Sequence, residues 1–336
     1  MGPMRVLQGA FGEQRQQTVV EAAYDHFRLD RQGNLVSANT LQHYDYLVVP
    51  FFEWLHRTHP DVRRFEDLDV SVLRHYRAEQ ARRTSEKTGR PVEPATVLDS
   101  HRLLMTFLRW AAEEEYPVDP RILKLKAPKV PLKEPTIYHI AQVRQILGAC
   151  DAKLPQEELA VRILVGSGVR ASELCGLALR APDGLADLML DSLVRGRVEL
   201  RVRWDGGAKG MKSRRVPITP KLASAIKRYQ ARYRRLVDVP TVLVNERGGS
   251  YTRFGIDALM DRLESRVGFH VHAHGFRHTF ATVVTKLGWN FEHLRAAMGH
   301  ADYSMLQRYV RLASERDLGP LKDWSEFVVA DPALVN

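Results

Sequence analysis

A helical core pattern and a cluster of polar side chains coincide in the stretch His274-Gly-Phe-Arg-His-Thr-Phe-Ala-Thr282. At about 100° per residue, four apolar residues bunch on one narrow helix face: Phe276, Phe280, Val283 and Leu287. His274, Arg277 and His278 fall on the other side, within about one quadrant of each other, and should point away from the core. Such a pairing suits a phosphate, because arginine offers a planar donor fork and histidine can move a proton near neutral pH. Taken alone, the pattern is more typical of a polar surface face.

A tyrosine and another histidine lie downstream, at Tyr309 and His300. On one continuous helix they would face opposite ways, because they are nine residues apart. However, Gly299 is a natural helix stop, and Ser304 with Gln307 has the pattern of a capping box that starts a new helix. Tyr309 then lies in the second turn of a short helix, and His300 lies in the turn before it. We therefore expect both side chains to approach one site.

Two more basic residues lie in glycine-rich surroundings. Arg170 follows a glycine break and precedes a new helix, where backbone N–H groups favour an anion and Glu173 could orient the guanidinium. Lys209 lies at the tip of a β-hairpin predicted over residues 198–218, and Lys212 competes with it for the same role. Taken singly, these features fit an arginine–glutamate pair at a helix start and an ordinary basic turn.

Together and in this order, the residues resemble one family. The tyrosine recombinases, also called the phage integrase family and including the Xer and Cre-like enzymes, carry Arg, Lys, His-x-x-Arg, His or Trp, and Tyr in their second domain. The corresponding residues here are Arg170, Lys209, His274, Arg277, His300 and Tyr309. The motifs that carry the resemblance are Gly168-Val-Arg-Ala-Ser-Glu-Leu174, His274–Thr282 and Gly299-His-Ala-Asp-Tyr303, and the match spans residues 18–320. The hairpin departs from the usual Gly-Lys-Gly-x-Lys, because Ala208 replaces the first glycine.

The resemblance implies that DNA strands are cleaved and rejoined without a metal, ATP or another cofactor. The Tyr309 hydroxyl would attack the scissile phosphate and leave a 3′-phosphotyrosyl bond and a free 5′-hydroxyl. Arg170 and Arg277 would neutralise the non-bridging oxygens in the transition state. His274 is then the expected general base for Tyr309. Lys209 would protonate the leaving oxygen, and His300 would donate a hydrogen bond to the phosphate.

Apolar residues recur at helical spacing through most of the chain, so we predict a mainly α-helical fold with one small antiparallel β-sheet. The predicted helices cover residues 40–56, 67–84, 94–114, 156–167, 221–235, 252–267, 274–287, 290–298 and 304–313. The resemblance implies a helical, SAM-like core-DNA-binding domain over residues 18–120 and the α/β catalytic domain of the recombinase fold over 136–320, the two clamping DNA. Residues 1–17 are then a short extension, 121–135 a basic interdomain linker, and 321–336 a C-terminal tail.

Basic residues suggest where DNA binds. The chain has 50 Lys and Arg against 40 Asp and Glu, a formal net charge of +10, which favours nucleic acid as a partner. Residues 199–236 include twelve Lys or Arg and only two Asp or Glu. Residues 121–133 carry five positive charges and no acid. We expect this segment, called the basic strap below, to lie along a phosphate backbone and not to be a solvated linker. The expected DNA contacts are Arg102, Thr106 and Arg109 on one helix face, Lys124, Lys126 and Lys129 in the strap, and Lys212, Arg214 and Arg215 in the hairpin.

Composition excludes several classes of protein. A chain of 336 residues exceeds the usual size of one domain, and its 44% hydrophobic and 27% charged residues are typical of globular proteins and not of disordered ones. Cys150 and Cys175 lack metal-ligand spacing and are typical of reduced core residues. The sequence shows no signal peptide and no apolar run near the roughly 20 residues that a membrane span needs. We therefore expect a cytoplasmic protein with no membrane partner.

The C-terminal tail has apolar residues at roughly helical spacing, among them Trp324, Phe327 and Val328, and they need a partner. They could fold back on their own domain. The resemblance favours a neighbouring subunit, because a C-terminal helix often docks in trans in this family, within a ring of four subunits on two DNA sites. The expected partners are double-stranded DNA with specific recombination sites and three further copies of the chain.

Three alternatives remain open at this point. Alternating histidines could make a metallo-hydrolase from His270, His272, His274 and His278, although no acid lies among them. A non-catalytic DNA-binding regulator would form no covalent adduct. A type IB topoisomerase shares the chemistry and would relax DNA as a monomer without a specific site. The sequence does not separate integration, excision, inversion and dimer resolution.

Overall fold

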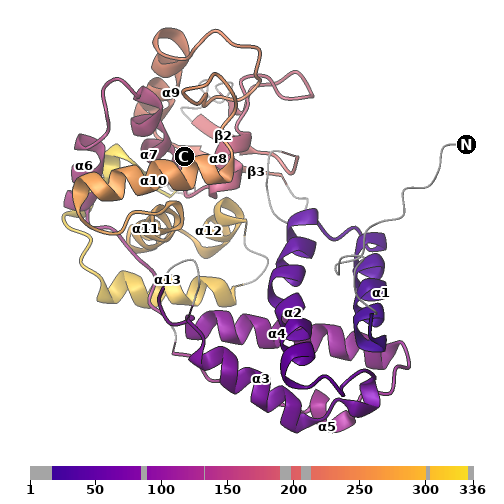
Figure 1. Ribbon diagram of the computed structural model, residues 1–336. Helices are drawn as coiled ribbons and strands as arrows, with labels where there is room; N and C mark the ends of the chain where they lie inside the picture. The colour runs from indigo at the N-terminus through magenta and orange to yellow at the C-terminus, as the bar shows by residue number, and fades with distance from the viewer. Residues whose placement is uncertain are drawn as a thin grey trace, which may run out of the picture. The chain divides into compact units, whose positions relative to one another are not determined.

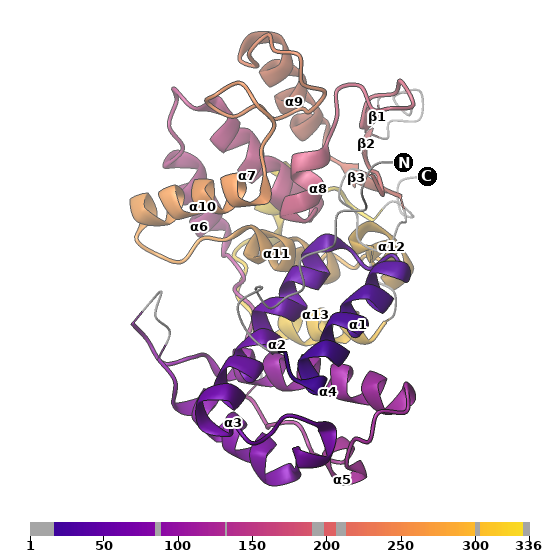
Figure 2. The ribbon, with the colours of Figure 1, turned by 45° about the vertical axis from the view of Figure 1, so that its right-hand side comes forward.

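The computed structural model describes residues 17–84, 89–131, 133–189, 198–205, 213–299 and 303–331. The chain divides into two compact units, one up to Lys133 and one from Glu134 onward, and each unit has its own hydrophobic core. In Figures 1 and 2 the first unit is indigo to magenta and the second runs on to yellow. The described part is mainly helical with one small antiparallel sheet, which confirms the predicted fold class.

The first unit is a helical bundle. Its elements are α1 (Val19–Gly33), α2 (Ala38–Thr58), the short 3-10 turn η1 (Phe65–Asp67), α3 (Val70–Arg82), α4 (Pro94–Glu113) and α5 (Pro120–Leu123). Helix α4 packs against α1, α2 and α3 because its buried face is rich in large side chains. The Phe107 ring of α4 meets that of Tyr24 edge-on at 5.3 Å and lies 5.7 Å from that of Phe27. Ile122 of α5 is buried in this core, so the basic strap predicted from residue 121 begins inside the first unit.

The second unit packs helices around a three-stranded sheet. Its helices are α6 (Ile140–Gly148), α7 (Pro155–Ser167), α8 (Ala171–Gly176), α9 (Pro220–Arg232), α10 (Arg253–Val267), α11 (Ala273–Lys286), α12 (Phe291–Met298), α13 (Ser304–Glu315) and the 3-10 helix η3 (Leu321–Glu326). Its strands are β1 (Leu188–Met189), β2 (Val198–Val202) and β3 (Arg214–Ile218), in the order β1-β2-β3 with antiparallel pairing. Strands β2 and β3 are those of the predicted hairpin, paired from Val198 with Ile218 to Val202 with Arg214.

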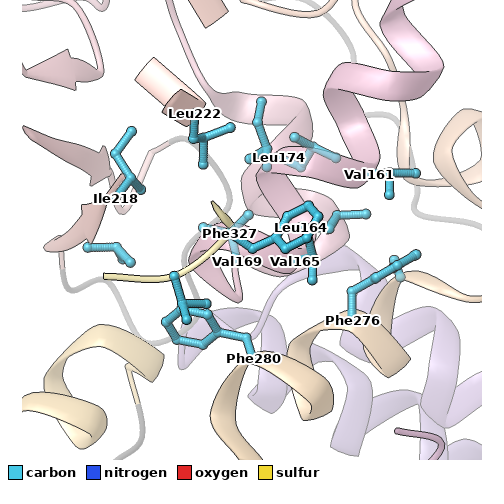
Figure 3. Packing of buried hydrophobic residues seen from close by; sticks show 14 of the residues in the cluster. Val161, Leu164, Val165, Val169, Leu174, Ile218, Leu222, Phe276, Phe280 and Phe327 are labelled. Carbon is cyan, nitrogen blue, oxygen red and sulfur yellow. The ribbon is translucent and has the colours of Figure 1, made fainter. Parts of the chain in front are cut away.

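Helix α11 is the central element of the site. Phe276, Phe280 and Val283 of its apolar face are buried as predicted, and Figure 3 shows both phenylalanines in one apolar cluster with Val165 of α7 and with Val169, which follows that helix. Its opposite face differs from the prediction, because α13 packs along α11. His278 on this face contacts Tyr309 of α13, and Arg277, which binds carbonyls at the ends of α7 and α12, is 1% exposed. His274 at the start of the helix remains exposed. The polar face of α11 is therefore largely buried against other helices, and not exposed as a surface face would be.

The C-terminal tail, where the structure describes it, folds back on the second unit. Trp324 is fully buried, and its indole Nε1 donates to the Leu318 carbonyl at 3.0 Å. Phe327 lies among the α7 residues Leu164 and Val165 in Figure 3. Its backbone carbonyl lies so close to Gly166 that a Cβ there would approach it to 2.9 Å. In the single chain, the apolar side chains of Trp324, Phe327 and Val328 thus find partners in their own unit, and docking of the tail in a neighbouring subunit stays a prediction.

We expect Trp324→Ala to lower the free energy of unfolding of the second unit by about 3–5 kcal/mol, the usual cost of emptying a large aromatic site. Equilibrium unfolding in urea measures this loss. Trp204→Ala is a matched control because that indole is 54% exposed, and it should change stability by no more than about 0.5 kcal/mol. Equal small effects of the two substitutions would show that the tail does not belong to this core in solution.

Candidate active site

Arg277 links α11 to the ends of two other helices. Its Nη1 donates to the Gly168 carbonyl at 2.6 Å, just after α7, and its Nη2 donates to the Met298 carbonyl at the end of α12. Gly168 has φ +61°, and a Cβ there would approach the Phe280 ring to 2.4 Å, so only glycine fits this turn. Burial, and then the charge of Arg170, lower the pKa of Arg277 to about 9, which leaves it charged at neutral pH.

Arg170 begins helix α8 and pairs with Glu173, as the sequence suggested. Its Nη1 donates to Oε1 of Glu173 at 2.7 Å, and its backbone N donates to Oε2 at 2.7 Å. The Glu173 side chain is fully buried, whereas that of Arg170 is 25% exposed. Burial alone would raise the pKa of Glu173, but the hydrogen bonds and charges of Arg214, followed by those of Arg170, outweigh it and lower the pKa to about 2. Glu173 is therefore a fixed anion that orients two arginines.

Arg214 was predicted to contact DNA at the surface, and this prediction is wrong because its side chain is buried. Its side chain is only 9% exposed, and its Nη1 and Nη2 donate to the two Glu173 oxygens at 2.9 and 2.7 Å. Its Nε donates to the Ala297 carbonyl at 2.7 Å. Because the guanidinium is buried and bound on two sides, Arg214 is a structural link between β3, α8 and α12. Its neighbour Arg215 is 64% exposed, as a DNA contact requires.

Tyr309 and His278 meet where α13 packs on α11. Tyr309 is 3% exposed and His278 is 7% exposed, and Nδ1 of His278 lies 3.1 Å from the tyrosine Oη. Burial raises the pKa of Tyr309, while the nearby charges of Arg277, Arg308 and Arg170 act in the opposite direction. The structure therefore brings Tyr309 into the same site as both arginines.

The two histidines of α11 lie against each other. The rings of His274 and His278 meet edge-on, with centroids 4.3 Å apart. Partial desolvation, and then the charge of Arg277, lower the pKa of His274 to about 4, although this residue is exposed overall. Burial, and then the charges around it, lower the pKa of His278 to about 3. Sequence analysis placed both on one helix face but did not identify His278 as the partner of Tyr309; its spacing of four residues from His274 was the available signal.

Three expected site residues, Lys209, Lys212 and His300, lie outside the described residues. The described chain stops on either side of them, at Asp205 and Ser213 and at Gly299 and Tyr303. Gly299 has φ +61°, and a Cβ there would lie 3.2 Å from the Arg214 side chain. Gly299, the last described residue before His300, therefore lies directly against the Arg214 side chain.

Most of the expected DNA contacts of the first unit are exposed. Arg102 and Arg109 of α4 and the strap residues Lys124, Lys126 and Lys129 are all exposed. The hydroxyl of Thr106 donates to the Arg102 carbonyl of its own helix at 2.9 Å, and this residue is only partly exposed. The two arginines and three lysines thus remain available to an anionic partner.

The alternating histidines do not converge as a metal site in the part of the chain that the structure describes. Within those ranges, no three His, Cys, Asp or Glu side chains lie close enough together to hold an ion. His270 instead pairs with Glu264, with 2.8 Å between Nδ1 and Oε2. None of the described helices combines the length and the apolar character that a membrane span needs.

Comparisons with known proteins agree with this geometry. The model of the phage integrase family matches residues 138–316. The chain is 30% identical over 201 residues to tyrosine recombinase XerA of Thermococcus kodakarensis, which covers 59% of the chain and 66% of that protein. It is 23% identical over 266 residues to tyrosine recombinase XerC of Bacillus licheniformis, covering 76% and 80%. Its fold is similar to the Tn1549 transposon integrase in complex with circular intermediate DNA, with a TM-score of 0.65 and 18% identity over 90% of this chain and 100% of that one.

Proposed function

Because the chain belongs to the phage integrase family and is a site-specific DNA recombinase of the tyrosine type, we propose that Tyr309 cuts and rejoins DNA through a covalent bond to phosphorus. Its hydroxyl attacks the scissile phosphate, and the products are a 3′-phosphotyrosyl bond and a free 5′-hydroxyl. The observation that supports this most is the position of Tyr309, which is close enough to Arg277 and Arg170 for their positive charges to act on its hydroxyl by lowering the pKa. The bond energy stored in the ester lets the strand be rejoined without a nucleotide cofactor.

The arginines supply the positive charge that the transition state needs. A phosphodiester resists attack because its oxygens are already negative and gain charge as the fifth bond forms. Arg170 and Arg277 would neutralise the non-bridging oxygens through charge-assisted hydrogen bonds. Lys209, with Lys212 as its competitor, would protonate the leaving oxygen, and His300 would donate to the phosphate. His274 would act as the general base for Tyr309, as the resemblance implies.

The DNA duplex would bind along exposed basic residues. We assign this role to Arg102, Arg109, Lys124, Lys126, Lys129 and Arg215, all of them exposed, with Thr106 beside them on α4. The protein would work as a tetramer on two paired sites in the cytoplasm, and would integrate, excise or resolve DNA according to how those sites are arranged.

We expect the double substitution of Arg102 and Arg109 by alanine to weaken DNA binding without changing the rate of cleavage of bound DNA. Each lost phosphate contact should reduce the slope of log K against log salt concentration by about 1. Affinity measured at several salt concentrations tests this. An unchanged slope would remove this face of α4 from the DNA interface.

The experiment that tests the proposed function is sequencing of DNA trapped covalently on the protein in the cells that produce it. We expect one recurrent sequence attached at a fixed phosphate. Attachment at many unrelated sequences would instead indicate a type IB topoisomerase. DNA that binds but never becomes covalently attached would indicate a non-catalytic regulator.

A further inference from the structure

His278 is a buried titratable group to which the mechanism above gives no role. It lies on α11 and is 7% exposed, and its Nδ1 is 3.1 Å from the Tyr309 hydroxyl oxygen, the atom that would attack phosphorus. The two side chains come from helices that pack along each other, so their contact is held by the core of the second unit. A donor–acceptor distance of this length is within the range for proton transfer.

The surroundings of His278 keep the imidazole neutral. The charged and titratable groups that act on the ring are His274, Arg308, Arg277 and His272. Because the ring is buried and the arginines near it are positive, protonation of the imidazole is disfavoured, and the pKa of His278 is lowered to about 3. A neutral imidazole has one nitrogen with a free lone pair. Burial also raises the pKa of the Tyr309 phenol, which keeps its proton. In the tautomer with the imidazole proton on Nε2, Nδ1 is free to accept the phenol O–H.

We propose that His278 is a further catalytic residue, which orients the Tyr309 hydroxyl and accepts its proton during the attack. This inference rests on the proposed function of Tyr309 as nucleophile. As the bond between Oη and phosphorus forms, the Oη proton moves to Nδ1 of His278, and the bond between phosphorus and the 5′ oxygen breaks. That oxygen takes a proton from the general acid. In rejoining, the imidazolium returns its proton to the tyrosine. His278 would thus take the general-base role that the resemblance implies for His274, and His274, which is exposed, would hydrogen-bond to the phosphate instead.

The same charges would make the basicity of His278 depend on bound DNA. Without DNA, Arg277 and Arg308 disfavour a proton on His278, so the tyrosine stays protonated and unreactive. A phosphate bound between Arg170 and Arg277 brings negative charge that offsets the arginines, and the imidazole becomes a stronger base. The nucleophile would thus be activated only when the scissile phosphate is in place.

Single-turnover cleavage tests the proposal. The substrate is a duplex that carries the trapped core sequence, with a nick beside the scissile phosphate so that the adduct accumulates. His278→Phe and His278→Gln should slow adduct formation by about 100- to 10,000-fold and leave DNA affinity within about twofold. The glutamine variant keeps a polar side chain, so a folded protein without the base remains available. His270→Gln, which changes an exposed histidine outside the site, should cleave at the normal rate.

A fluorinated tyrosine at position 309 separates proton acceptance from packing. Its phenol ionises at lower pH, so the nucleophile needs less help from a base. We expect this replacement to restore most of the rate lost in His278→Gln and to change the unsubstituted chain little. A normal rate in both His278 variants, or a loss that fluorination does not restore, would overturn the proposal. Faster cleavage would also overturn it and would mean that His278 restrains the tyrosine. Absence of any adduct from the unsubstituted chain would instead refute the proposed function.

Discussion

Tyr309→Phe should abolish formation of the covalent DNA adduct and leave DNA binding nearly unchanged. The substitution removes only the attacking oxygen, and the ring, which is 3% exposed, keeps its place between α11 and α13. The hydrogen bond to His278 is lost, but the packing of the ring is kept, so the fold should persist. Denaturing electrophoresis of protein mixed with the nicked duplex measures the adduct, and gel retardation measures binding.

Tyr303→Phe is the matched control for that experiment. Tyr303 is a nearby tyrosine that is 47% exposed, and the Arg295 guanidinium lies 5.5 Å from the centre of its ring. Phenylalanine preserves this contact with the ring, so the control should form adduct at the normal rate. If Tyr309→Phe still formed adduct and Tyr303→Phe did not, the nucleophile would be Tyr303.

Replacing Arg170 or Arg277 by alanine should raise the barrier to cleavage by about 3–4 kcal/mol, or about 100- to 1,000-fold in rate, and lower DNA affinity much less. The reason is that both guanidinium groups are expected to meet charge that develops only in the transition state. Lysine should rescue poorly at either position, because it lacks the planar fork that also bridges Arg170 to Glu173 and Arg277 to two carbonyls.

Arg215→Ala provides the contrast, because this exposed arginine of β3 is proposed to touch DNA away from the reacting phosphate. The substitution should weaken DNA binding and leave the rate of cleavage of bound DNA unchanged. Rates and affinities are measured on the same nicked duplex. If Arg170→Ala and Arg277→Ala reduced binding and cleavage equally, as a simple phosphate anchor would, neither arginine would be assigned to the transition state.

The sequence predicted the parts of the site that depend on local pattern. Helical spacing placed Phe276 and Phe280 on the buried face of α11, and glycine breaks placed Arg170 at the start of a helix. The β2–β3 hairpin was predicted from the alternation of apolar and polar residues on either side of a glycine-rich turn. These features are encoded within about a dozen neighbouring residues, which is the range over which periodicity and capping act.

What the sequence did not predict depends on contacts between distant segments. Helix α13 pairs His278 of α11 with Tyr309, 31 residues later, and carbonyls at the ends of α7 and α12 bind the buried Arg277. Arg214 was expected at DNA, but the carboxylate of Glu173, 41 residues earlier, holds it inside the protein. The two-residue strand β1 was also missed, because a segment this short shows no alternation. No local pattern shows which of two basic neighbours is buried.

The most direct test of the central claim is mass spectrometry of the covalent complex after digestion of both protein and DNA. We expect the remaining nucleotide to be linked through phosphorus to the peptide that contains Tyr309, and the link to form at the 3′ end of the cleaved strand. A nucleotide on any other residue, or a link at the 5′ end, would contradict the account.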